Sequence, residues 1–330
     1  MSAAPEITID RHVGGASDMG EEVREGLTRE PLKELPPKLF YDARGSELFD
    51  QITAQPEYYP ARAERSILNR CSPEIVELSG ADELVELGSG VASKTRALLY
   101  AMAGTGTLYR YVPFDIDRSV VETCATELTE VLPGMCVHGV VGDFARDLER
   151  LPEGDHRLIA FLGGTVGNLY PDERAEFLAR VRDQMGPSDH LLVGMDLVKD
   201  RGVLEAAYND SAGVTAAFNL NVLNAVNEGL GADFDLDDFE HVAFFDPGAA
   251  RIEMRLRSLC DQHVSLPGAG VEIDLAEGEE IRTEISSKFT RARIEYELEA
   301  AGLELTRLFC DDEGLFSLAL AAAAAGRSSP

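Results

Sequence analysis

Glycines, carboxylates and an aromatic ring follow three apolar runs in the first half of the chain. The motif Gly88-Ser89-Gly90 follows residues 83–87, Asp115 ends the run 108–115, and Asp143-Phe144 comes two residues after the run 137–141. Glycine has no Cβ, so its backbone lets a ligand pass close by. One carboxylate can accept both hydroxyls of a ribose, and a second carboxylate beside a ring suits an adenine. These residue types predict an adenosine-binding site.

Each of these features also has an ordinary structural explanation. Tight turns between a strand and a helix often use glycine, and an aspartate after a strand is often only the N-cap of the next helix. All three nevertheless stand at successive strand ends of one expected sheet, which is where open α/β sheets bind ligands. NAD is the competing cofactor, but the run 88–93 lacks the third glycine of the GxGxxG motif. We therefore expect S-adenosylmethionine.

The apolar runs that position these residues alternate with helical patterns, as in a parallel sheet wrapped by helices. We expect strands over residues 83–87, 108–115, 137–141, 157–162 and 190–195, helices over 93–103 and 119–131, and a final strand pair over 303–310 and 315–322. A terminal hairpin is foreign to the dinucleotide-binding fold. The order predicts an α/β class I methyltransferase (Rossmann-like) sheet.

The alternation stops after Lys199, which predicts an inserted second α+β domain. We expect helices over 203–208 and 214–230, the second ended by Gly231, and strands over 241–245, 251–259, 271–275 and 281–286. We assign residues 63–198 plus 289–330 to an S-adenosylmethionine-binding methyltransferase domain. Residues 1–62 plus 199–288 are assigned to a lid-like, substrate-binding domain.

The composition of the chain limits the kinds of partner that it can bind. The 330 residues carry a net charge of −29, which disfavours nucleic acid and anionic membranes. No apolar stretch reaches the roughly 20 residues of a spanning helix, and residues 1–20 lack the apolar core of a signal peptide. Five scattered cysteines without a CxxC pair indicate reduced thiols and no metal site. We expect a cytoplasmic monomer that acts on a small molecule.

Nine sequence blocks in order carry a closer resemblance. They are 41–46 with 48–50, 56–60, 86–90 with 94–96, 112–115, 161–168, 196–200, 208–210 with 218–219, 252–256 and 283–289. Over residues 38–316 the chain resembles the histidine Nα-methyltransferases of ergothioneine biosynthesis, which produce hercynine. The resemblance implies an enzyme that transfers methyl groups from S-adenosyl-L-methionine to the α-amine of L-histidine.

The resemblance also implies a role for individual side chains. Cofactor binding is expected of Gly88, Lys94, Asp115, Asp143 and Phe144. Asn168 and Tyr208 are expected to bind the substrate carboxylate, and Tyr58, Glu284 and Ser286 the imidazole ring, with Met254 packed beside it. Tyr41 and the backbone of Gly163 are expected near the reacting amine.

Without the resemblance, several of these residues have simpler interpretations. Asn168 can cap the next helix, Lys94 can be a solvated first-turn residue, and Glu284 and Ser286, two apart in a strand, can alternate onto a solvent face. With it, the chemistry expected is direct displacement, in which the protein mainly aligns the amine and Tyr41 guides its proton away. The alternatives are N-methylation of another amino acid such as tryptophan, for which Glu284 is the discriminating residue, and a non-catalytic S-adenosylmethionine-binding protein.

Overall fold

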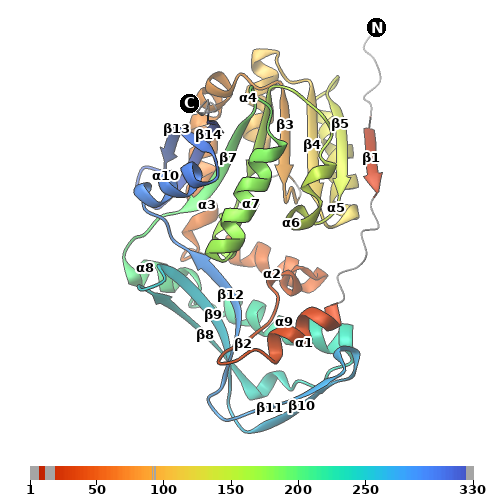
Figure 1. Ribbon diagram of the computed structural model, residues 1–330, viewed down its shortest axis with the longest axis vertical. Helices are drawn as coiled ribbons and strands as arrows, with labels where there is room; N and C mark the ends of the chain where they lie inside the picture. Colours follow the sequence, from red (N-terminus) through yellow and green to blue (C-terminus); the bar gives the residue numbers. More distant parts are fainter. Residues whose placement is uncertain (1–6, 12–18, 91, 93, 325–330) are drawn as a thin grey trace, which may run out of the picture. The chain divides into compact units, whose positions relative to one another are not determined.

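The computed structural model describes residues 7–11, 19–90, 92 and 94–324. The chain divides into two compact units (Figure 1). Unit 1 comprises Met1–Gly14, Ala63–Leu197 and Phe289–Pro330, and unit 2 comprises Gly15–Arg62 and Val198–Lys288.

Unit 1 is built around an eight-stranded sheet of order β1-β5-β4-β3-β6-β7-β14-β13 (Figure 1). Its strands are β1 (Ile7–Arg11), β3 (Glu83–Leu87), β4 (Arg110–Asp115), β5 (Cys136–Val141), β6 (Arg157–Phe161), β7 (His190–Asp196), β13 (Leu303–Cys310) and β14 (Phe316–Ala323). The pairs from β1 to β7 are parallel, whereas β14 is antiparallel to both β7 and β13. The expected parallel sheet closed by a terminal hairpin is confirmed.

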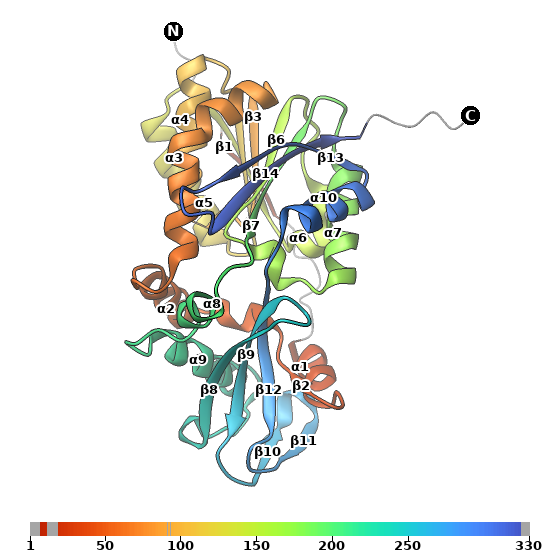
Figure 2. The same ribbon diagram turned by 90° about the vertical axis from the view of Figure 1, so that its left-hand side faces the viewer.

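Helices cover both faces of this sheet, which is why β3 and β6 are buried along their whole length. They are α3 (Tyr59–Ser79), α4 (Arg96–Thr105), α5 (Arg118–Val131), α6 (Phe144–Asp147), α7 (Pro171–Gln184) and α10 (Arg291–Ala300), with 3₁₀ turns η2 (Leu148–Arg150) and η3 (Thr165–Asn168). One apolar core includes residues of α3, α4 and α5, and a second includes residues of α7 and α10. Figure 2 shows α3 and α5 on one side of the sheet and α7 and α10 on the other. The parallel strands therefore all end at one edge, where the connecting loops lie.

Two details of unit 1 differ from the expectation. The strand β1, residues 7–11, pairs in parallel with β5 in the sheet of unit 1, whereas residues 1–62 as a whole were expected in the other domain. The helix expected over 93–103 begins at Arg96 and ends at Thr105, and residues 91 and 93 of the glycine-rich run lie outside the described residues.

Unit 2 combines helices with a four-stranded sheet of order β2-β12-β9-β8 and a two-stranded sheet of β10 and β11. Its strands are β2 (Lys33–Glu34), β8 (Phe239–Asp246), β9 (Arg251–Ser258), β10 (Gln262–Leu266), β11 (Val271–Leu275) and β12 (Glu280–Ser287), and its helices are α1 (Met19–Leu27), α2 (Ala43–Thr53), α8 (Arg201–Ala207) and α9 (Val214–Leu230), with 3₁₀ turns η1 (Pro37–Tyr41), η4 (Leu236–Asp238) and η5 (Pro267–Ala269). Gly231 ends α9 in the left-handed region at φ 64°, as expected. The strands β2 and β10 had no counterpart in the sequence prediction.

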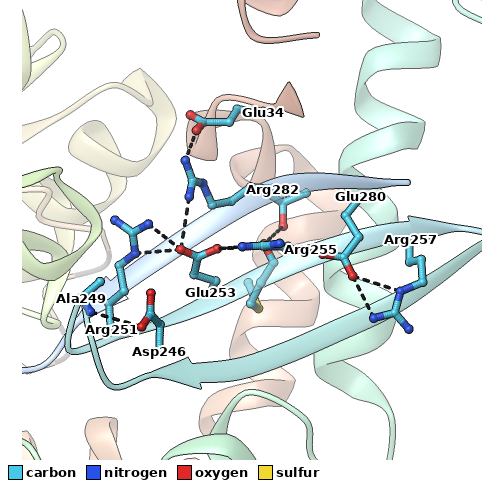
Figure 3. Close-up of polar contacts among 11 residues, drawn as sticks. Glu34, Asp246, Ala249, Arg251, Glu253, Arg255, Arg257, Glu280 and Arg282 are labelled. Carbon is cyan, nitrogen blue, oxygen red and sulfur yellow. Dashed lines mark hydrogen bonds and ion pairs between the residues drawn. The ribbon is translucent and has the colours of Figure 1, made fainter. Parts of the chain in front are cut away.

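Alternation along β9 gives the four-stranded sheet two different faces. Ile252, Met254 and Leu256 are buried on one face. The other face carries arginines bridged by carboxylates, among them Glu253, which pairs with Arg251 and Arg282 (Figure 3). Isolated surface ion pairs contribute little, but a network around one buried carboxylate holds the strands together.

A bulge in β12 decides which of its side chains reach the apolar face. Arg282 lies opposite Arg255 and Glu284 opposite Met254, so Thr283 is the extra residue. A bulge re-aims the side chains that follow it. Arg282 therefore points to the arginine face, while Glu284 and Ser286 point to the face of Met254.

Candidate active site

The loop after β3 is fastened to the end of β4 through Asp115. One Asp115 oxygen accepts the N–H of Gly90 at 2.9 Å, and the other accepts the N–H of Asp117 at 3.0 Å. Asp117, not Asp115, caps α5. Asp115 is thus a half-buried carboxylate beside a glycine turn, with Gly88 at φ 72°. This is a suitable acceptor for the hydroxyls of a ribose.

The next strand end carries Asp143 and Phe144. Asp143 is the N-cap of α6 and accepts the N–H of Ala145 at 2.9 Å, as the simpler interpretation of this residue expects. The half-buried Phe144 ring packs edge-on against Phe161, with centroids 5.1 Å apart. A Cβ on Gly88 would stand 3.7 Å from the Phe144 ring, so the glycine and the ring lie next to each other.

Lys94 is not a solvated surface lysine. Its Nζ contacts the carboxylate of Glu64 at 2.7 Å, and Glu64 is fully buried. The second Glu64 oxygen accepts the N–H of Gly163 at 2.7 Å. Glu64 therefore joins Lys94 to the loop after β6. Gly163 has φ 81° and Gly164 φ 72°, a conformation that favours glycine at both positions.

A second buried carboxyl group lies in β3, near Lys94. Glu86 accepts hydrogen bonds from the hydroxyls of Thr95 and of Tyr111, the latter at 2.5 Å. Burial raises the pKa of Glu86 to about 7, although these two hydrogen bonds and the charge of Lys94 lower it. The glycine-rich loop thus rests on a carboxyl group that is partly protonated near neutral pH.

Asn168 ends the turn η3, which begins at the Gly163-Gly164 bend. It is half-buried, and the N-cap of the following helix α7 is Tyr170 rather than Asn168. Within the described residues its amide makes no hydrogen bond. Asn168 therefore retains donors and an acceptor for a ligand at the edge where the strands of unit 1 end.

In unit 2 the hydroxyls of Tyr208 and Ser286 meet a buried lysine. The Tyr208 hydroxyl donates to Ser286 Oγ at 2.8 Å, and Lys288 Nζ donates to Tyr208 Oη at 3.0 Å and to Ser286 Oγ at 2.9 Å. Lys288 is fully buried and lies over the Tyr208 ring, 4.7 Å from its centroid. The structure thus brings two of the expected substrate residues into contact.

Glu284 lies on the same face of β12 as Ser286 and directly opposite Met254. Burial raises the pKa of Glu284 to about 7, while the charge of Lys288 lowers it. No described residue donates a hydrogen bond to its carboxylate. An acceptor that is desolvated and unpaired beside an apolar side chain is the arrangement expected of a ligand-binding group.

A network of hydrogen bonds fixes the backbone of Tyr208. His241 Nε2 lies 2.9 Å from the backbone oxygen of Tyr208, and Asn219 Nδ2 lies 2.9 Å from His241 Nδ1. Asn219 Oδ1 in turn accepts from the hydroxyl of Thr283 at 2.6 Å. Burial lowers the pKa of His241, which favours a neutral ring that donates from Nε2. The network therefore ties α8, α9 and the β12 bulge together.

The two remaining expected residues are tyrosines of unit 2. The Tyr58 ring lies edge-on to the Tyr208 ring, with centroids 6.3 Å apart, so Tyr58, Tyr208, Ser286, Glu284 and Met254 form one group. Tyr41, at the end of η1, is 56% exposed.

Sequence reasoning missed Glu64 and Lys288, although each carries a signal. Glu64 occurs on the buried stripe of α3 with Ile67, Leu68 and Cys71, and a carboxylate on an apolar stripe indicates a buried partner. Lys288 continues the period-two alternation of Glu284 and Ser286. Both are buried charges held by hydrogen bonds to residues that were expected in the site.

The described residues contain neither a cluster of metal ligands nor a membrane-spanning helix. No group of three or more His, Cys, Asp and Glu side chains is placed to hold a metal ion. None of the described helices combines the length and the apolar character that crossing a membrane requires.

Comparisons with known proteins show the family of the chain. Residues 19–323 match the model of a family described as "Histidine-specific methyltransferase, SAM-dependent". The chain is 51% identical to the histidine N-alpha-methyltransferase of Mycolicibacterium smegmatis, over 93% of this chain and 95% of the relative. It is 47% identical to that of Mycobacterium tuberculosis, over 96% and 99%. An L-tryptophan methyltransferase of Psilocybe serbica is 28% identical, over 93% of each chain. The chain belongs to the S-adenosylmethionine-dependent, histidine-specific methyltransferase family.

Proposed function

We propose that this enzyme methylates the α-amine of L-histidine three times and so forms hercynine, as in ergothioneine biosynthesis. The main support for histidine as the substrate is the pair Glu284 and Ser286. These residues present a carboxylate and a hydroxyl on one face of β12, beside Met254. An imidazole has polar nitrogens on an otherwise apolar ring, and this face offers both kinds of contact. The names of the two most similar relatives considered above support the same substrate.

Unit 1 has the residues that S-adenosylmethionine needs. We propose that Asp115 binds the ribose of the cofactor and that Asp143 and Phe144 bind its adenine. The backbone of the turn at Gly88 is proposed to pass close beside the bound cofactor. Ser89 supports the fit, because its buried hydroxyl has no partner among the described residues. Lys94, held by Glu64, supplies a positive charge for the carboxylate of the methionine moiety. When bound, the sulfonium supplies an activated methyl group.

Ile116 belongs to the same proposal. It follows Asp115 directly and is 63% exposed, which is unusual for so apolar a side chain at a strand end. We assign it to packing against the adenine ring, on the side opposite Phe144. An exposed apolar residue directly after the expected ribose-binding acid is the sequence signal for it.

The protein's own contribution to the reaction is alignment and proton removal. Glu284 accepts the ring N–H, and Asn168 is assigned to the carboxylate as a neutral donor. The one proton of the Tyr208 hydroxyl goes to Ser286, so Tyr208 orients Ser286 and does not donate to the carboxylate. Direct displacement requires the amine to face the methyl group with its lone pair free, and such positioning is worth up to about 7–11 kcal/mol in model reactions. Tyr41 and the backbone of Gly163 are assigned to the amine, where the Tyr41 hydroxyl guides the released proton to solvent.

N-methylation of tryptophan is the second candidate, because a tryptophan methyltransferase is among the relatives. An indole has one N–H and no acceptor nitrogen, so it satisfies fewer of the polar groups on the Glu284 face. We therefore favour histidine. Competition between equal concentrations of the two amino acids, followed by mass analysis of the products, distinguishes them; preferential methylation of tryptophan would overturn the assignment.

We further propose a cytoplasmic monomer without nucleic-acid partners. The net charge of −29 repels phosphate backbones. Light scattering after size-exclusion chromatography measures the oligomeric state, and a mass of twice 35.8 kDa would contradict a monomer.

A further inference from the structure

Lys288 is a fully buried lysine whose ammonium group contacts the hydroxyls of Tyr208 and Ser286, two of the residues proposed to line the histidine site. Its Nζ lies 2.9 Å from Ser286 Oγ and 3.0 Å from the Tyr208 hydroxyl oxygen. A buried charge without compensation costs several kcal/mol. A methionine would fill a similar volume without this cost. We therefore expect the charge of Lys288, or its hydrogen-bond donors, to have a role in the site.

The hydrogen bonds determine what Ser286 can offer to a ligand. An ammonium group only donates, and a hydroxyl has one proton and two acceptor lone pairs. Ser286 Oγ accepts from Lys288 and, at 2.8 Å, from the Tyr208 hydroxyl. Both of its lone pairs are therefore occupied. Among the described residues no acceptor receives the Ser286 proton, so this hydroxyl can only donate to a ligand.

Glu284 presents the opposite character two residues away on the same face. An ionised carboxylate only accepts, and the charge of Lys288 favours this ionised form by lowering a pKa that burial raises. The lysine thus acts on both neighbours. It leaves Ser286 as a donor and helps to keep Glu284 an acceptor.

A neutral imidazole has one N–H and one bare ring nitrogen, which matches one acceptor and one donor. We propose that Lys288 is a positioning residue for substrate choice: by occupying the lone pairs of Ser286 it selects a ring with both an N–H and an unprotonated nitrogen. The inference rests on the proposed function, since it takes the imidazole of histidine as the ligand of this face. A ring that lacks the bare nitrogen leaves the Ser286 proton unpaired.

The test compares histidine with the two pyrrolylalanines, in which one or the other ring nitrogen is replaced by CH. The wild-type enzyme should prefer histidine over both by about a hundredfold or more in kcat/KM, because sites built around a polar partner strongly reject analogues without it. In Lys288→Met the Ser286 hydroxyl can turn and accept. We expect KM for histidine to rise about tenfold with a smaller change in kcat, and the preference over the better pyrrolylalanine to fall about tenfold.

A double variant shows whether Lys288 acts through Ser286. Ser286→Ala should lose the same preference, and Ser286→Ala/Lys288→Met should lose no more than Ser286→Ala alone. The matched control is Lys199→Met, because Lys199 also donates to a tyrosine of unit 2, Tyr59, at 2.7 Å and lies over its ring. This control should keep the wild-type preference for histidine.

The outcomes separate the inference from the proposed function. No methylation of histidine by the wild-type enzyme means that the function is wrong. Methylation of histidine with equal use of a pyrrolylalanine overturns the inference even if Lys288→Met does not fold. An unchanged preference in a Lys288→Met protein that still binds S-adenosylhomocysteine normally overturns it as well.

Discussion

Glu284 and Asp115 are both carboxylates at strand positions, yet their surroundings assign them to different ligands. Asp115 accepts two backbone N–H groups. Glu284 lies opposite Met254 without a hydrogen-bond donor among the described residues. A carboxylate held rigidly by a glycine turn suits hydroxyls of fixed geometry, whereas an unpaired one in an apolar setting suits a single N–H.

The two carboxylates should therefore fail in different ways. Glu284→Ala should raise KM for histidine about 10- to 100-fold, the value of a hydrogen bond to a charged group, and leave the Kd of S-adenosylhomocysteine unchanged. Asp115→Ala should raise that Kd by a similar factor. Calorimetry gives the Kd and initial rates give KM.

Glu280→Ala is the matched control for this pair. Glu280 is in the same strand as Glu284, but its carboxylate contacts Arg255 and Arg257 on the arginine face. Its removal should change neither constant. The reverse pattern, with Glu284 affecting the cofactor and Asp115 affecting histidine, would mean that the two sites are interchanged.

At this scale the sequence predicted residue types better than residue surroundings. Asp115 and Asp143 looked alike as strand-end acids, but only Asp143 caps its helix. Whether an aspartate caps the next helix depends on the length of the turn that follows it, and that length is set by packing. The roles of Glu64 and Lys288 depend on partners 30 and 80 residues away, which local patterns do not show.

At the scale of elements, two buried carboxylates support the loops proposed to bind the cofactor. Glu86 lies in β3, and Glu64 binds the turn after β6. Glu86 has a folded pKa of about 7 against 4.5 for the unfolded chain. The unfolded state therefore loses its proton first. The stability contributed by the protonated form is fully present below pH 4.5 and is lost as the pH rises through 7.

Glu86→Gln should remove this pH dependence. Between pH 5 and pH 8 the unfolding free energy of the wild-type protein should fall by about 2–3 kcal/mol more than that of the variant. Urea unfolding at both pH values measures it. Parallel curves for the two proteins would show that Glu86 ionises as an exposed carboxylate does.

Gly194 in β7 provides a second prediction about these elements. A Cβ at this position would stand 2.6 Å from the Glu64 carboxylate and 3.3 Å from the nitrogen of Gly164. Gly194→Ala should cost about 1–3 kcal/mol of stability and weaken S-adenosylhomocysteine binding, because Glu64 holds Lys94 and Gly163.

Gly104→Ala is the control for this change. A Cβ there meets nothing within 4 Å, and in helix α4 alanine should stabilise by up to about 1 kcal/mol. Thermal melts with and without S-adenosylhomocysteine compare the two variants. Gly194→Ala with normal stability and normal binding would contradict the role given to Glu64.

Element prediction succeeded where the apolar pattern was long and failed where packing decided. The parallel strands and α9 lie close to their expected bounds, because buried runs and glycine stops are local signals. The bulge at Thr283 is not local. Simple alternation places Arg282, Glu284 and Ser286 on one face, but the bulge separates Arg282 from the other two. The extra residue, Thr283, donates a hydrogen bond to Asn219 in α9, a partner far away in the sequence.

For the whole molecule, the order of strands allowed the class of fold to be predicted, and the resemblance allowed the reaction to be predicted. Unit 2 was harder to predict, since its short strand β2 has only two residues and pairs with β12, far along the chain. The N-terminal strand β1 likewise pairs with a strand about 130 residues later. Such long-range pairing leaves little trace in a single sequence.

The central claim is that the face of β12 that carries Glu284 and Ser286 selects histidine as the acceptor of methyl groups from S-adenosylmethionine. The most direct measurement incubates the purified enzyme with both compounds and weighs the amino-acid product over time. The account predicts a product with three added methyl groups, all on the α-amine, and a loss of this product in Glu284→Ala at low histidine. Histidine that stays unmodified, or that gains its methyl groups on the imidazole ring, would contradict it.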